Sequence, residues 1–152
     1  EVCCASVGER LVEAGHGIRI EADCTVAELY AEKLDMIVLP GGLGGVQSIL
    51  GSEETLELIR RVYDEGKFVA AICAAPSILG KKGLLEGREA IAFPGFEKDL
   101  HGAFVSKSHV VKDENFITAK GAGVAVKFGL EIVAALLGRK KSDEIFEQIQ
   151  CE

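Results

Sequence analysis

The sequence predicts an α/β domain in which helices cover both faces of a doubly wound, largely parallel sheet. Three features predict it: short continuous apolar runs, amphipathic stretches between them, and Gly/Pro turns that follow the runs. Continuous apolar runs are typical of parallel strands buried on both faces. Strands that alternate with helices favour a three-layer sandwich. A chain of 152 residues suits one such domain, covering residues 1–152.

The first part of the chain contains two expected core strands. Val2–Val7 is an apolar run, and Met36–Leu39 is a second one that ends in Pro40-Gly41-Gly42. Between them, Ile18–Ala22 alternates as a half-buried strand does, and Val26–Lys33 is expected to form a short helix. The glycines after the second run indicate a tight loop at a strand end.

A long helix and another central strand come next. The helix begins after Ser52, a good N-cap residue, and ends at Gly66. Phe68–Ile72 is the second central strand. Ala74–Leu79 begins a further helix, with Pro76 tolerated in its first turn.

The last part of the chain continues the alternation. Glu89–Phe93 is an expected strand, and His109–Val111 with Phe116–Ala119 has the pattern of a hairpin. Val124–Leu137 is a strongly amphipathic helix. A final short helix is expected after Ser142.

Composition excludes several classes of function. The formal net charge is −7, whereas a surface for nucleic acid or anionic membrane would need clustered Lys and Arg. The most apolar stretch, residues 68–79, is too short to cross a bilayer. The five cysteines (Cys3, Cys4, Cys24, Cys73 and Cys151) form no C-x-x-C pair, and the three histidines are scattered, so no zinc site is predicted. Free thiols favour a cytoplasmic protein.

Cys73 is the strongest candidate for chemistry. In residues 70–76 a buried strand turns directly into a helix, with the thiol at the joint and small residues around it, as in a nucleophile elbow. Unpaired N–H groups at a helix start favour the thiolate. The backbone amides of Gly42 and Ala74 are placed to face an oxyanion formed on an attacked carbonyl. The alternative is that Cys73 is simply a small buried hydrophobe.

Four segments together resemble the DJ-1/PfpI (ThiJ/PfpI) superfamily and, in order and spacing, its DJ-1-like branch. They are Asp35–Gly42, Ala70–Pro76, Phe93–Glu97 and Phe116–Gly121. The resemblance runs over nearly the whole chain. It implies a flavodoxin-like sandwich, a homodimer, and an oxidation-sensitive nucleophile at Cys73 with the Gly42 and Ala74 amides as its oxyanion site.

The resemblance also implies an activity. This is a cofactor-independent glyoxalase that converts methylglyoxal or glyoxal to a hydroxy acid, or a deglycase acting on early glycation adducts, in protection against oxidative stress. The alternative is a redox sensor or chaperone-like protein that signals through oxidation of Cys73 to the sulfinate. Proteolytic members place a His directly after the cysteine, where this chain has Ala74, so a protease is not expected. His101 lies one residue from a family histidine position, and is either its substitute or a plain surface-loop histidine.

Members of this superfamily begin with a strand and a helix ahead of the segment that matches Val2–Val7. That unit carries a glutamate that hydrogen-bonds the nucleophilic cysteine. We therefore expect a companion N-terminal segment of about thirty residues. Its strand should pair with both Val2–Val7 and Met36–Leu39, because the backbone groups of buried strands must be paired. Its glutamate should lie close to Cys73.

Overall fold

The core of the fold is a four-stranded sheet of strand order β5-β6-β10-β9, seen in a computed structural model that describes residues 1–150. The strands β5 (Met36–Leu39), β6 (Phe68–Ile72) and β10 (Phe116–Ala119) run parallel. β9 (Val110–Asp113) pairs with β10 in the antiparallel direction, as the hairpin pattern predicts. Cys151 lies outside the described residues.

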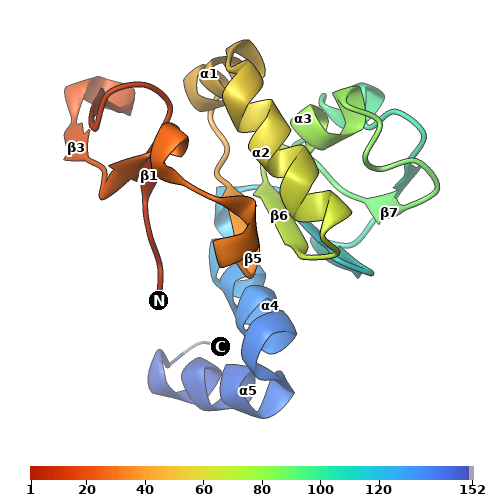
Figure 1. Cartoon of the computed structure of the whole chain (residues 1–152). Helices are drawn as coiled ribbons and strands as arrows, with labels where there is room; N and C mark the ends of the chain where they lie inside the picture. The colour runs from red at the N-terminus through yellow and green to blue at the C-terminus, as the bar shows by residue number, and fades with distance from the viewer. Residues whose placement is uncertain (151–152) are drawn as a thin grey trace.

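Helices lie on both faces of this sheet (Figure 1). One face is covered by α1 (Leu43–Gly51), α2 (Glu53–Asp64) and α3 (Pro76–Lys81). The opposite face is covered by α4 (Ala125–Leu137), against which α5 (Arg139–Gln148) packs. The arrangement is the predicted three-layer sandwich.

Strand β6 shows why the sheet is buried on both faces. Val69 and Ala71 pack with the α1–α3 layer, whereas Ala70 packs on the other face with Ile117 and with Phe128 of α4. Successive side chains of a strand point to opposite faces. A continuous apolar run is therefore required here, since every position of β6 meets a covered face.

Short elements complete the fold of residues 1–150. Three two-stranded ladders pair β1 (Ala5–Ser6) with β4 (Cys24–Thr25), β2 (Leu11–Glu13) with β3 (Arg19–Glu21), and β7 (Glu89–Ala90) with β8 (Phe104–Val105). Five 3₁₀ turns connect the elements: Gly15–Gly17, Val26–Glu28, Ala31–Lys33, Glu97–Asp99 and Ala122–Val124. The expected strand Glu89–Phe93 is thus shortened to its first two residues.

The opening of the chain differs from the predicted buried strand. Only Ala5–Ser6 of Val2–Val7 is a strand, it pairs with β4 in place of the central sheet, and the residues ahead of it are exposed. β1 and β5 do not pair with each other, and β5 is the edge strand of the four-stranded sheet. Val38 on β5 is 45% exposed, and no strand of residues 1–150 lies on the side of β5 away from β6.

Two further predictions are corrected by local geometry. Val26–Lys33 forms two separate 3₁₀ turns and no helix, because Leu29 and Tyr30 between them are extended. The Glu28 carboxylate accepts a hydrogen bond from the Thr25 amide at 2.8 Å and so stabilises only the first turn. Helix α1 was not predicted, since its glycine-rich sequence has weak helix propensity.

The final helix begins earlier than expected. Gly138 has φ +88° and breaks the chain between α4 and α5, so α5 begins at Arg139. Ser142 is buried within α5 and donates a hydrogen bond to the Leu130 carbonyl of α4 at 2.8 Å. Ser142 therefore joins the two helices and does not cap the second one.

Gly80 of α3 lies against the chain at residues 99–101, and this contact predicts a difference between two Gly→Ala substitutions. A Cβ at Gly80 would stand 2.2 Å from the Asp99 carbonyl oxygen and 2.6 Å from the Leu100 Cα. Because these are backbone atoms, Gly80→Ala should lower the free energy of unfolding by about 1–3 kcal/mol.

Gly129 of α4 is the matched control, since a Cβ there meets no atom within 4 Å. Gly129→Ala should raise the free energy of unfolding by about 0.5–1 kcal/mol through the better helix propensity of alanine. Urea denaturation of both variants measures the two changes. Equal effects of the same sign would contradict the packing assigned to Gly80.

Candidate active site

Cys73 occupies a sharp turn between β6 and α3. Its φ is +66°, a left-handed conformation that non-glycine residues seldom adopt. Two hydrogen bonds hold the turn: the Cys73 amide donates to the Ala119 carbonyl at 2.9 Å, and the Phe93 amide donates to the Cys73 carbonyl at 2.7 Å. The half-buried thiol is thus fixed where β6 and β10 end, next to the loop that contains Phe93. This is the elbow geometry that the sequence predicts.

Gly41 makes the closest approach to the elbow. A Cβ on Gly41 would lie 2.6 Å from the Cys73 Cβ, 2.9 Å from the Ile72 carbonyl oxygen and 3.3 Å from the Cys73 Sγ. Real Cβ atoms do not tolerate the first of these distances. The loop after β5 can therefore reach the thiol only with glycine at this position.

The two amides predicted to bind an oxyanion belong to the residues that follow Gly41 and Cys73 in the chain. Gly42 follows Gly41 with φ +92° and precedes the first turn of α1, and Ala74 follows Cys73 directly. Within residues 1–150 neither amide donates a hydrogen bond to a protein acceptor. Both N–H groups are therefore without a protein partner in the described part of the chain.

Phe93 is a neighbour of Cys73 that the sequence analysis did not select. Its amide binds the Cys73 carbonyl, its side chain is 46% exposed, and a Cβ at Gly121 would lie 3.2 Å from its ring. The aromatic ring thus lies against the loop after β10. The available signal was an aromatic residue followed by Pro94-Gly95 after an expected strand.

His101 lies near the C-terminal end of α3. Its side chain is exposed, and its backbone nitrogen is 2.9 Å from where a Cβ on Gly80 would stand. Cys73 precedes the N-terminal end of the same helix. Among residues 1–150, no carboxylate or imidazole hydrogen-bonds the Cys73 sulfur.

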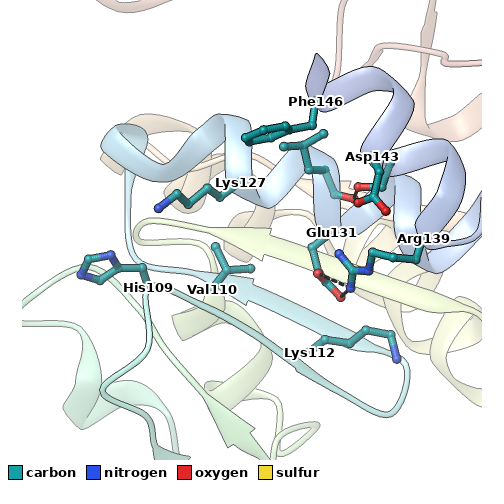
Figure 2. Close-up of a pocket in the computed structure, with 10 residues that line it drawn as sticks. His109, Val110, Lys112, Lys127, Glu131, Arg139, Asp143 and Phe146 are labelled. Atoms are coloured by element: carbon teal, nitrogen blue, oxygen red, sulfur yellow. Dashed lines mark hydrogen bonds and ion pairs between the residues drawn. The ribbon is translucent and has the colours of Figure 1, made fainter. Parts of the chain in front are cut away.

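A surface cavity of about 490 Å³ lies between β9, α4 and α5 (Figure 2). His109, Lys112 and Lys127 lie around it, and Arg139 forms an ion pair with Glu131 at 3.0 Å. No residue of the elbow lines this cavity. The cavity is therefore separate from the candidate active site.

No cluster of three or more potential metal ligands occurs in residues 1–150. Over the same residues, every helix is too short or too polar to cross a membrane.

The sequence pattern of the DJ-1/PfpI family matches residues 1–135. The chain belongs to the DJ-1/PfpI family. It is 36% identical over 140 residues to protein dj-1beta of Drosophila melanogaster, covering 91% of this chain and 75% of that protein. The crystal structure of Drosophila DJ-1beta superposes with a TM-score of 0.92 at 33% identity, over 100% of this chain and 83% of the other.

Other relatives agree with this assignment. The structure of oxidized Toxoplasma gondii DJ-1 gives a TM-score of 0.93 at 28% identity, covering 99% of this chain and 83% of that one. A Pyrococcus abyssi protein named as a deglycase is 32% identical over 138 residues, covering 90% of this chain and 82% of that protein. The chain spans 38% of DJ-1 homolog A of Arabidopsis thaliana. The predicted family and flavodoxin-like fold are confirmed.

The contact between Gly41 and Cys73 predicts the effect of adding one methyl group. Gly41→Ala should destabilise the fold by about 1–3 kcal/mol, because the elbow must move to accept the Cβ. The same shift should change the rate at which Cys73 is alkylated by iodoacetamide. Urea denaturation and peptide mapping of the alkylated protein measure the two effects.

Gly45, in the first turns of α1, is the control for this substitution. A Cβ there meets no atom within 4 Å, so Gly45→Ala should raise the free energy of unfolding by about 0.5–1 kcal/mol through helix propensity and leave the alkylation rate of Cys73 nearly unchanged. If the two variants behave alike, Gly41 is not required for the elbow.

Proposed function

We propose that this chain is a cysteine-dependent enzyme of the glyoxalase or deglycase type, acting on small dicarbonyls or early glycation adducts without a metal or organic cofactor. The observation that carries the proposal is the left-handed elbow at Cys73, which holds a half-buried cysteine directly before α3 and in contact with the Gly41 loop. Membership of the DJ-1/PfpI family and the relatives named as deglycases support it.

In the proposed reaction, the Cys73 thiolate attacks the aldehyde carbon of methylglyoxal. The C–S bond forms as the carbonyl π electrons move to oxygen, and the amides of Gly42 and Ala74 donate to the resulting oxyanion. A base then moves a proton from the former aldehyde carbon to the neighbouring carbon, which leaves a thioester. Water cleaves the thioester and releases the hydroxy acid and the free thiol.

The proposed base is a carboxylate on the expected companion strand. Such a strand would pair with the free edge of β5, and β5 leads into the Gly41 loop that contacts Cys73. A carboxylate on the strand next to β5 would therefore be placed to approach Cys73. The half-exposed thiol, with no acidic partner among residues 1–150, is consistent with this placement.

Replacing the thiol tests the nucleophile. Cys73→Ser should abolish methylglyoxal consumption and leave the fold intact, because a serine hydroxyl does not ionise near neutral pH without a dedicated base. A coupled lactate assay measures the rate, and circular dichroism checks the fold. Cys4→Ser is the control and should keep full activity. Activity of Cys73→Ser within about tenfold of the parent, roughly 1.4 kcal/mol of barrier, would refute the nucleophile.

Substituting His101 tests whether the loop histidine takes part. His101→Ala should change kcat/KM far less than Cys73→Ser does, because His101 lies beside the other end of α3. The same assay compares the two variants. A loss as large as that of the cysteine variant would show that His101 acts as a general acid or base.

The second candidate is a redox sensor that signals through the same residue. The exposed part of the Cys73 thiol favours this function as well, since oxidation to sulfinic acid requires access by peroxide. The test uses the intact chain together with any bound companion segment. The sensor is supported over the enzyme if this protein consumes no dicarbonyl and Cys73 is the first residue that peroxide oxidises. Peptide mapping after peroxide treatment identifies the oxidised residue.

A further inference from the structure

Two other thiols lie in contact in the N-terminal part of the chain. The Cys3 Sγ is 3.2 Å from the Cys24 Sγ, although the two residues are 21 positions apart in the chain. Cys3 is exposed and Cys24 is partly exposed. Cys24 lies in β4, which pairs with β1, and Figure 1 shows β1 set apart from β6, at whose end the elbow lies.

The β1–β4 ladder holds this pair together. Ala5 is opposite Cys24 in the parallel register. One residue ahead of β1, the Cys4 amide donates to the Asp23 carboxylate at 2.8 Å, and the Asp23 amide donates to the Cys4 carbonyl at 2.9 Å. These hydrogen bonds fix the backbone next to both cysteines. The pairing of β1 with β4 therefore brings the two sulfur atoms together.

The chemistry around the pair is that of two thiols and no metal. Within residues 1–150 the neighbouring acidic groups do not complete a cluster of three potential metal ligands. The hydrogen bond with Cys24 is the main cause that raises the pKa of Cys3, and the nearby charges of Asp23 and Glu1 act in the same direction. Cys4, the next residue in the chain, makes no sulfur contact with Cys24.

We propose that Cys3 and Cys24 form a reversible intramolecular disulfide, a modification site that is independent of Cys73. The sulfurs must approach from 3.2 Å to about 2.0 Å, and exposed side chains can make this adjustment by rotation about χ1. The bond closes a loop that contains the β2–β3 hairpin and clamps the two-residue β1–β4 ladder.

The oxidant is hydrogen peroxide or a small disulfide such as oxidised glutathione. With peroxide, one thiolate attacks an oxygen atom, the O–O bond breaks, and a sulfenic acid and water form. The second sulfur then attacks the sulfenic sulfur, the S–O bond breaks, and a second water leaves. Two thiols lose two electrons and two protons in total, and peroxide is reduced to two waters.

Redox titration of the whole chain tests the site. The reduced protein is equilibrated in glutathione buffers, trapped with N-ethylmaleimide, and mapped by mass spectrometry without reduction. We expect a monomeric product in which the tryptic peptide that contains Cys3 and ends at Arg10 is joined to the peptide that contains Cys24. Dilution should not change its yield, because the bond is intramolecular.

Variants identify the partner, since Cys3 and Cys4 fall in the same tryptic peptide. Cys4→Ser and Cys73→Ser should keep the parent titration curve. Cys3→Ser, which leaves Cys4 and Cys24, should lower the equilibrium constant for the disulfide by at least about tenfold.

Hydrogen exchange provides a second measurement. Oxidation should slow amide exchange in β1 and β4 and leave β6 and β10 unchanged, since only the first ladder is clamped. The proposal is overturned if the dominant disulfide contains Cys73 or Cys151, if it joins two chains, if Cys4→Ser and Cys3→Ser titrate alike, or if no disulfide forms in oxidising buffers.

Discussion

The fold around the thiol depends on one steric constraint, the contact of a glycine backbone with a left-handed turn. Cys73 holds φ +66° only because its amide and carbonyl are bound by Ala119 and Phe93, and because Gly41 presents no side chain to it. Strain of this kind persists where the surrounding structure overdetermines it. The segments that contain Gly41, Phe93 and Ala119 thereby meet Cys73 at the carboxyl ends of the central strands.

The sequence was sufficient to predict the central layers. β6 is a continuous apolar run that helices bury on both faces, and β5 is a second such run paired with it. The peripheral segments were harder to predict. α1 is rich in glycine, and its place in the core comes from burial of Val46 and Ile49, a tertiary effect that local propensity does not reveal.

The residues of the candidate site also include some that could be predicted from sequence and some that could not. Cys73, Gly42 and Ala74 could be selected from sequence because a nucleophile and small residues follow buried strands. Gly41 and Phe93 could not, since their roles depend on contacts between segments about 20 to 50 residues apart. The exposed position of Cys3 and Cys4 was mispredicted for a related reason: apolar character indicates a strand, but the pairing partner of the strand decides whether it is buried.

The free side of β5 has a consequence for behaviour in concentrated solution. An edge strand with unpaired N–H and C=O groups and an exposed Val38 is a template for any extended chain. Proteins usually protect such edges with charge, proline or a covering segment, whereas Met36–Leu39 has none of these within it. The solubility of the protein therefore depends on which strand pairs with this edge. Competition for the edge by a strand of a second copy would couple folding to self-association.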